Sequence, residues 1–235
     1  MKTYLSYGGG VNSTACIVLH AQGKLHYDEA IYVDHGCDWP ETREYVRMMA
    51  ERFPITILKP DVEGFDNLYD YFWHYQIIPW MAVRFCTMKF KVGVIEQHIK
   101  TPCFMLVGID AGEQHRAKIS NNGGVENRFP LIEAGVGREN CKKLIYDYGL
   151  QIPPKSGCYF CPYQRISQWK KLRRKYPNLF CKAEQLEARN IANSEAKGKV
   201  GHFIHSSKKP LRDVVKEKAE FLFEEMKYPP CECEL

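Results

Sequence analysis

The stretch SYGGGVNST, residues 6–14, contains three consecutive glycines near the start of the chain. Glycine loses more backbone entropy on folding than any other residue, so a run of three indicates that something approaches this backbone closely. The apolar residues 3–6 before it predict a strand, and residues 13–21 after it predict a helix. A glycine-rich turn between a strand and a helix directs backbone N–H groups and the positive end of the helix at an anion. The pattern therefore indicates a phosphate site.

Two common phosphate loops do not match this stretch. A Walker A loop requires a lysine after its glycines, and the spacing here is not that of a dinucleotide-binding GxGxxG turn. A tight structural turn is the alternative, but hydroxyl groups on both sides of the glycines favour phosphate binding. The residues expected to bind a nucleotide are Ser6, Gly8, Gly9, Gly10, Asn12, Ser13 and Thr14.

Short apolar runs alternate with helical patterns over the first 135 residues. We predict strands at residues 3–6, 29–34, 55–58 and 104–109, and helices at residues 13–21, 41–52 and 89–100. Strands that alternate with helices imply parallel crossovers. The expected fold is α/β, a Rossmann-like open parallel sheet with helices on both faces, in a nucleotide-binding domain of residues 1–135.

The character of the chain changes after this domain. Residues 136–235 are rich in cysteine, proline and basic residues, and they predict helices near 139–149, 166–175 and 211–226 but little strand. This part has too few apolar runs to form a core of its own. We expect a smaller, helical, cysteine-containing region packed on the first domain.

Charge is distributed unevenly along the chain. Residues 142–218 contain 18 Lys and Arg against 6 Asp and Glu, whereas the rest contains 15 against 22. The densest basic run is 170–175, next to Trp169. A basic segment of this size favours an anionic partner, tRNA or DNA, through residues 142–218. A solvated helix face is the alternative for the run itself.

Composition excludes a membrane-spanning protein of the helical type. The sequence has no run approaching the 18 or so apolar residues of a membrane span, and we expect a cytoplasmic protein with no membrane partner. Ten cysteines in such a chain indicate metal binding or catalysis rather than a disulfide framework.

The cysteine spacing suggests a metal site. Cys158 and Cys161 form a Cys-x-x-Cys pair in a turn, Cys141 lies 17 residues earlier, and Cys86 belongs to the first domain. Four thiolates fit either zinc or a [4Fe–4S] cluster, and unligated thiols stay an alternative. Cys37 follows a predicted strand near the expected phosphate position and is a weaker candidate for handling sulfur.

Five segments, in order, resemble the phosphoadenosine phosphosulfate (PAPS) reductase-like family of the PP-loop, or adenine nucleotide alpha hydrolase, superfamily. The resemblance spans almost the whole chain and is closest to phage and bacterial members with a Cys-x-x-Cys pair. The segments are SYGGGVNS (6–13), VDHGCDWPET (33–42), RFCTMKFK (84–91), GIDAGEQHR (108–116) and PPKSGCYFCPY (153–163). The chain departs from the family pattern at Asn12, where Asp is commoner, at His35, where Thr is usual, and at Asp110, where Arg is usual.

The resemblance implies an enzyme that binds ATP, or a sulfonucleotide, with Mg²⁺ and acts between the α and β phosphates. It also favours a [4Fe–4S] cluster over zinc at Cys86, Cys141, Cys158 and Cys161. Asp34 is expected to contact the ribose or Mg²⁺. The other residues expected to bind or act on the nucleotide are Arg84, Lys89, Gly108, Glu113 and Arg116.

These observations leave three functions open. The first is a PP-loop enzyme that uses ATP and an iron–sulfur cluster to transfer or remove sulfur on nucleic acid, with a sulfur or electron donor protein as partner. The second is an assimilatory sulfonucleotide reductase, which requires a mobile cysteine such as Cys233 in the terminal PPCECEL. The third is a non-catalytic nucleotide- or nucleic-acid-binding protein held together by zinc.

Overall fold

A single sheet organises the molecule. The computed structural model describes residues 1–117 and 121–216, and its sheet has the order β3-β2-β1-β4-β6-β5. Every neighbouring pair is parallel except the β5–β6 hairpin. The strands are β1 (Lys2–Ser6), β2 (Glu29–Val33), β3 (Ile55–Leu58), β4 (Cys103–Val107), β5 (Asn121–Asn122) and β6 (Val125–Arg128). The predicted open parallel α/β sheet is confirmed, and the hairpin is an addition to it.

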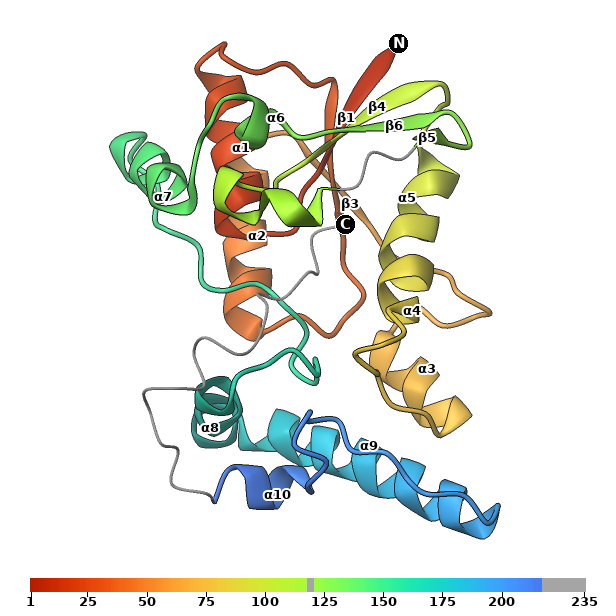
Figure 1. The fold of residues 1–235 in the computed structure, drawn as a ribbon. Coiled ribbons are helices and arrows are strands. Elements are labelled where there is room, and N and C mark those ends of the chain that lie inside the picture. The colour runs from red at the N-terminus through yellow and green to blue at the C-terminus, as the bar shows by residue number, and fades with distance from the viewer. Residues whose placement is uncertain (118–120, 217–235) are drawn as a thin grey trace.

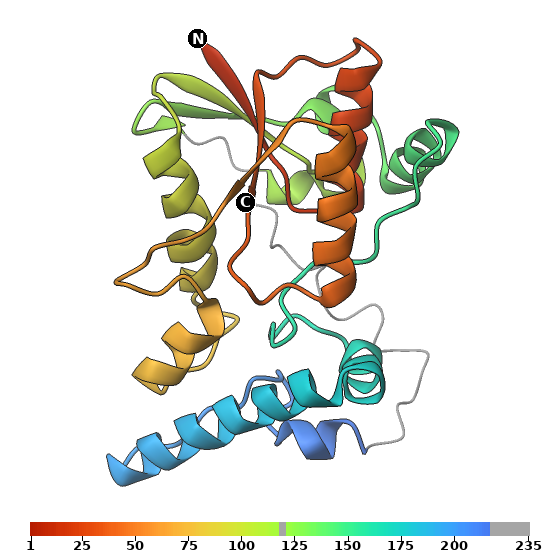
Figure 2. The same cartoon turned by 180° about the vertical axis from the view of Figure 1, so that it is seen from behind.

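Helices cover both faces of this sheet (Figures 1 and 2). One face carries α1 (Val11–Ala21), α2 (Pro40–Arg52), α6 (Pro130–Glu133) and α7 (Arg138–Asp147). The other face carries α5 (Gly93–His98). Successive strand residues point to opposite faces, so Leu5 and Leu106 join the α1 side of the core while Tyr4 and Met105 join the α5 side.

The predicted helix at 89–100 is divided into a π-helical turn, η1 (Met88–Val92), and α5. A short helix, α4 (Phe85–Thr87), precedes them. Short π-helical segments are rare and occur often at functional sites. A short 3₁₀ helix, η2 (Ala111–Arg116), follows β4.

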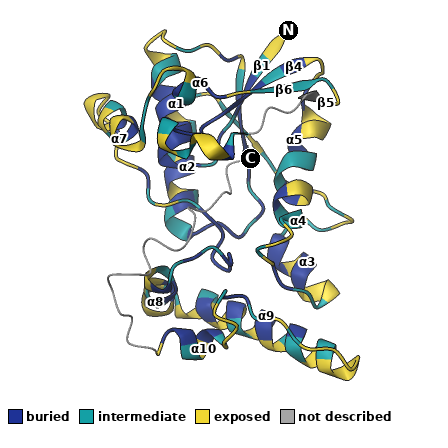
Figure 3. Cartoon of the chain, viewed as in Figure 1, coloured by how far each residue is buried: buried dark blue, intermediate teal, exposed yellow. Residues whose placement is uncertain are grey.

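A further layer of helices lies beyond the carboxyl ends of the strands, at the bottom of Figure 1. It consists of α3 (Leu68–Tyr75), α8 (Ile166–Lys175), α9 (Pro177–Ala196) and α10 (Leu211–Val214). Its core combines residues of both parts of the chain, such as Phe72, Phe90, Trp169 and Leu186, and Figure 3 shows the buried sides of these helices turned inward. The cysteine-containing region thus shares a core with the first 135 residues.

The predicted helices of this region are found at α7 and α8. The helix predicted for 211–226 is present as α10, and its remainder lies outside the described residues. The 20-residue α9 and the shorter α3 were not predicted. Within the described residues, no helix has the length and apolar character needed to cross a membrane.

Candidate functional site

The order of the strands creates a crevice at the carboxyl edge of the sheet. The chain runs outward from β1 through β2 to β3 and then returns to β4, on the other side of β1. The connections that leave β1 and β4 therefore diverge, and such a switch point is where open α/β sheets bind ligands. The glycine loop (residues 6–14) follows β1, and residues 108–110 follow β4. The predicted phosphate loop lies at the switch point.

The conformation of the glycine loop depends on the absence of a side chain at Gly9. Its φ is +69°, and a Cβ there would lie 2.8 Å from Cγ2 of Val46 and 3.2 Å from Cγ2 of Thr42, both on α2. The Gly8 N–H donates to Ser13 Oγ (3.3 Å), and this hydroxyl lies 3.4 Å from the Gly10 carbonyl oxygen. Ser13 therefore braces the loop, and the N-terminus of α1 faces the turn with a glycine as its cap.

The end of β4 lies directly against this loop. A Cβ at Gly108 would lie 2.7 Å from the backbone nitrogen of Ser13, so the two backbones are in contact. Beside them, Asn12 Nδ2 donates to Asp110 Oδ2 (3.1 Å), and both residues are about 1% exposed. Asp110 Oδ1 also accepts from the Gly112 N–H (2.9 Å). Two of the positions that depart from the family pattern are thus hydrogen-bonded to each other.

Glu113 and Arg116 follow on η2 and pair with one another. Arg116 Nη1 lies 2.6 Å from Glu113 Oε2, and Arg116 is buried. The guanidinium charge is therefore compensated within the chain. Among the described residues, Arg116 Nε has no hydrogen-bond partner.

Asp34, Arg84 and Lys89, which were predicted to bind phosphate, lie at different places from one another. Asp34 follows β2, where it accepts from the Gly36 N–H (3.0 Å) and faces Arg43 of α2 (3.4 Å). Arg84 precedes α4 and is half-buried. Lys89 is exposed and donates to Glu63 (2.7 Å) and to the Tyr71 hydroxyl (3.0 Å).

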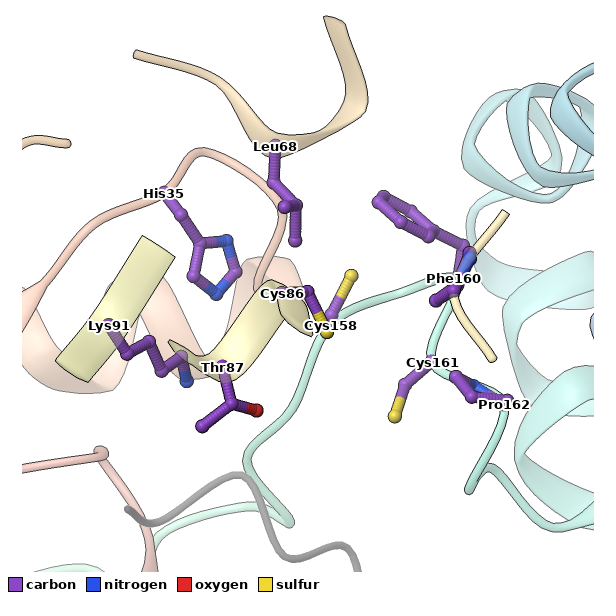
Figure 4. Close-up of a pocket in the computed structure, with 10 residues that line it drawn as sticks. His35, Leu68, Cys86, Thr87, Lys91, Cys158, Phe160, Cys161 and Pro162 are labelled. Atoms are coloured by element: carbon purple, nitrogen blue, oxygen red, sulfur yellow. The ribbon is translucent and has the colours of Figure 1, made fainter. Parts of the chain in front are cut away.

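A pocket at the same edge gathers residues from five stretches of the chain, and we call it the cysteine pocket (Figure 4). Lys91, rather than Lys89, lines it, because the two lysines lie on different sides of the π-helical turn. Cys86, Cys158 and Cys161 all line this pocket. The residues that line it are His35, Leu68, Pro79, Cys86, Thr87, Lys91, Cys158, Phe160, Cys161 and Pro162.

A buried ion pair forms one wall of the cysteine pocket. His35 Nε2 lies 3.4 Å from Asp38 Oδ1, and both side chains are 2% exposed. Burial alone would lower the pKa of His35, but the Asp38 carboxylate outweighs it and raises this pKa to about 9. Burial would raise the pKa of Asp38, but His35 holds it well below its usual range. Tyr32 Oη donates to Asp38 Oδ2 (2.6 Å) and fixes the carboxylate.

Cys37 lies behind this wall, with 1% of its surface exposed. Burial would raise the pKa of its thiol, but a hydrogen bond with Cys158 and the nearby His35 lower that pKa to about 6. Burial and the neighbouring Cys37 raise the pKa of Cys158 well above its ordinary value. The sequence did not indicate His35 as a site residue and indicated Cys37 only as a weaker candidate, although both belong to the VDHGCDWPET segment.

Cys141 does not join the cysteine pocket, which corrects the predicted set of four cysteines. It lies on α7 together with Ile145, and both are fully buried against the α1 side of the sheet. The i, i+4 spacing of these two residues makes the apolar face by which α7 packs on α1. Cys141 is thus a core residue of the first hydrophobic layer.

The chemistry of the cysteine pocket fits a thiolate-bound metal. Three thiols line it, and Cys37 is hydrogen-bonded to one of them. Thiolates are the ligands of structural zinc and of iron–sulfur clusters. Among residues 1–117 and 121–216, no group of three or more His, Cys, Asp or Glu side chains is placed to hold a metal ion.

A second, more polar recess lies between α2 and α8, and we call it the basic recess. It is lined by Trp39, Glu41, Pro154, Lys155, Arg165, Ser167, Gln168 and Lys171. Glu41 accepts from Lys175 (2.7 Å) and lies 3.5 Å from Lys171. The run 170–175 is therefore partly neutralised by α2, whereas Arg173 and Arg174 are exposed.

The fold and the glycine loop define an α/β protein with a glycine-rich loop between its first strand and its first helix. No family model matches the chain. A segment of 198 residues is 23% identical to an uncharacterized protein of Methanocaldococcus jannaschii and covers 75% of this chain but 45% of that protein, so the chain spans less than half of that relative.

Two solved structures are similar to the chain. The PAPS reductase from Candida auris in its phosphate complex matches with a TM-score of 0.49 and 15% identity, over 65% of this chain and 75% of that one. The U34-tRNA thiolase NcsA from Methanococcus maripaludis with its [4Fe–4S] cluster matches with 0.45 and 15%, over 79% and 71%. At 15% identity, both matches are likenesses of fold alone.

Proposed function

We propose that this chain is a PAPS reductase-like PP-loop enzyme. It binds ATP at the glycine loop, acts between the α and β phosphates, and uses a metal–thiolate centre for sulfur transfer or removal. One observation carries the proposal: the glycine loop and the cysteine pocket are tied to the same short element. Gly9 packs on Thr42 of α2, while the Trp39 N–H just before α2 donates to the Gly157 carbonyl (3.0 Å) of the Cys-x-x-Cys turn.

In this proposal, main-chain groups make most of the contacts with the nucleotide. Backbone N–H groups of the glycine loop and of the first turn of α1 bind the phosphates and stabilise the charge that develops between them. No covalent nucleophile is needed for such a step. Asp34, which follows β2, would contact the ribose or a bound Mg²⁺, which would neutralise phosphate charge. Arg84 would add positive charge beside the phosphates.

The cysteine pocket supplies the second part of the chemistry. Cys86, Cys158 and Cys161 would hold a [4Fe–4S] cluster or zinc, and a cluster would supply electron exchange for the sulfur chemistry. Lys91 and His35 bring positive charge to the same wall. They would hold an anionic sulfur or phosphate group next to the thiolates.

Nucleic acid is the proposed substrate, with a separate protein as sulfur or electron donor. The basic recess presents Lys155, Arg165 and Lys171 beside α8. Cations in this arrangement bind phosphodiester groups and position the polymer without reading its sequence. The overall balance of residues 142–218 supports this choice of partner.

The test is ATP turnover by the full chain with metal restored. We expect labelled ATP to yield pyrophosphate and an adenylated product or AMP when tRNA or DNA is present, and Ser13→Ala to lose this activity. PAPS reduction with thioredoxin that disappears in Cys233→Ser would establish the sulfonucleotide reductase instead; Cys233 lies outside the described residues. A zinc-containing protein that binds ATP without turnover would make the chain a binding protein.

A further inference from the structure

We propose that Cys37, rather than Cys141, is the fourth thiolate of the metal centre, together with Cys86, Cys158 and Cys161. This inference rests on the metal centre of the proposed function and adds to it a ligand that the spacing of the cysteines does not indicate.

The first support is the proximity of two thiols. Cys37 and Cys158 belong to the same buried cluster, and each thiol shifts the pKa of the other. A thiol beside one ligand of a metal centre can reach the same metal. Cys141 lies in a different hydrophobic cluster, between α7 and α1, and has no place in this contact.

The second support is the backbone that holds these two cysteines together. Asp38 and Cys158 form an antiparallel bridge, the Tyr159 N–H donates to the Cys37 carbonyl (2.9 Å), and the Trp39 N–H donates to Gly157 (3.0 Å). Residues 37–39 and 157–159 thus form a short two-stranded clamp. The clamp brings a residue that follows β2 to the Cys-x-x-Cys turn, 121 positions further along the chain. Such a clamp keeps the two sulfurs in register before metal arrives.

The third support is the environment of the Cys37 sulfur. Cys37 belongs to the same buried cluster as Cys158 and Cys161, and Cys86 packs against that cluster. The Cys37 Sγ lies 3.3 Å from Asn67 Oδ1, and Asn67 is itself fixed as the cap of α3 by accepting from the Tyr69 N–H (2.8 Å). This hydrogen bond orients the protonated thiol, and it is released when the thiol loses its proton to bind metal.

The charge of the surroundings also suits a fourth thiolate. Four thiolates around a zinc ion or a [4Fe–4S] cluster leave a net charge of about −2 at the centre. Lys91 lines the cysteine pocket and acts on both His35 and Asp38. Its ammonium group offsets part of the negative charge that a buried four-thiolate site accumulates.

The experiment compares single serine variants of the full chain, purified and reconstituted without oxygen. Iron, acid-labile sulfide and zinc are measured per chain, with the visible spectrum. We expect Cys37→Ser and Cys158→Ser to lose at least half of the metal, and the matched control Cys141→Ser to keep all of it. Full metal in Cys37→Ser, or loss confined to Cys141→Ser, would overturn the inference.

A measurement on the unmutated protein removes the concern that Cys37→Ser fails to fold. Iodoacetamide labelling is followed by mass spectrometry before and after the metal is removed with a chelator. We expect Cys37 to become labelled on metal removal together with Cys158, while labelling of Cys141 does not change. An unchanged Cys37 would contradict the proposal. If the wild-type chain takes up neither iron nor zinc, this inference and the metal centre fail, while ATP binding at the glycine loop is tested separately.

Discussion

The glycine loop and the cysteine pocket lie at the same sheet edge but are built in different ways. The glycine loop is made of main chain, and its shape depends on missing side chains at Gly9 and Gly108 and on one buried hydroxyl, that of Ser13. The cysteine pocket is made of side chains from segments far apart in sequence. A main-chain site is therefore visible in a short stretch of sequence, whereas a side-chain site depends on how distant segments pack.

The largest expected effect comes from placing a second carboxylate in the glycine loop. Asn12 donates to Asp110, and both are buried, so Asn12→Asp puts two carboxylates in contact. We expect a loss of about 3–5 kcal/mol in the free energy of unfolding at pH 8, as for an unpaired buried charge. The loss should shrink at acid pH, where one carboxyl group is protonated. Urea denaturation at pH 8 and pH 5 measures both values.

The reciprocal change at Asp110 makes this prediction sharper. Asn12→Asp combined with Asp110→Arg restores the residues usual in PAPS reductase-like proteins at both positions. We expect the pair to recover at least about 1 kcal/mol relative to the sum of the single variants, which is the coupling typical of contacting residues. Additive effects would show that the two departures are independent.

A methyl group at Gly108 should also destabilise the loop. Its Cβ would lie 2.7 Å from the Ser13 nitrogen and 3.0 Å from the Asn12 carbonyl carbon, and neither backbone can move without shifting α1 or β4. We expect Gly108→Ala to cost about 1–3 kcal/mol of stability and to weaken ATP binding by at least tenfold. Calorimetric titration with ATP and denaturant unfolding measure the two effects.

Gly137→Ala is the matched control for Gly108→Ala. Gly137 follows a turn and directly precedes the helix α7. A Cβ built at Gly137 meets no atom of the described residues within 4 Å. We expect a change within about 0.5 kcal/mol and unchanged ATP binding. An equal cost at both positions would mean that close backbone contact does not decide the effect.

These contrasts also explain what the sequence could reveal. The strands, the helices that flank them and the position of the glycine loop follow from local apolar periodicity and glycine spacing. The π-helical turn, in which Lys89 and Lys91 face different sides, is not predicted by such a pattern. The sequence therefore gives no reason to distinguish the two lysines. Cys141 seemed a ligand because it precedes the Cys-x-x-Cys pair, yet its i, i+4 partner Ile145 marks a packed helix face.

The helix α9 was missed for another reason. Its buried face includes Glu187 and Asn190, so that its apolar pattern is interrupted by polar residues. Glu187 accepts from the Leu211 N–H (3.1 Å) and serves the connection to α10. A polar residue that is buried to satisfy a backbone group cannot be distinguished from an exposed one without the tertiary structure.

Glu187 makes the stability of the helical layer beneath the cysteine pocket depend on pH, unlike that of the glycine loop. Burial raises the pKa of this carboxyl from 4.5 to about 7, so between these values the folded chain holds a proton that the unfolded chain has released. Its contribution to stability is full at low pH and is lost as the pH rises from about 4.5 through 7. We therefore compare the free energy of unfolding of Glu187→Gln with that of the wild type. We expect this difference to favour the variant by about 1–3 kcal/mol more at pH 8 than at pH 5.

Thermal or urea unfolding at a series of pH values tests this prediction. Glu195→Gln is the control, because Glu195 lies on the same helix but is exposed. The control should leave the pH dependence as it is. An identical pH slope in wild type and Glu187→Gln would show that another group is responsible.

The smallest effect is expected at α8, where nucleic-acid binding depends on charges that α2 does not neutralise. Arg173 and Arg174 are exposed, whereas Lys175 is paired with Glu41 at 2.7 Å. If each arginine neutralises a phosphate, removing one should lower the slope of log Kd against log salt by about 1. Lys175→Ala should change the slope less, because binding nucleic acid through Lys175 first requires breaking its pair with Glu41.

Filter binding with tRNA and with DNA between low and moderate salt measures the slopes. Equal slopes for wild type, Arg173→Ala and Arg174→Ala would remove α8 from the nucleic-acid surface and leave the basic recess alone to bind the polymer.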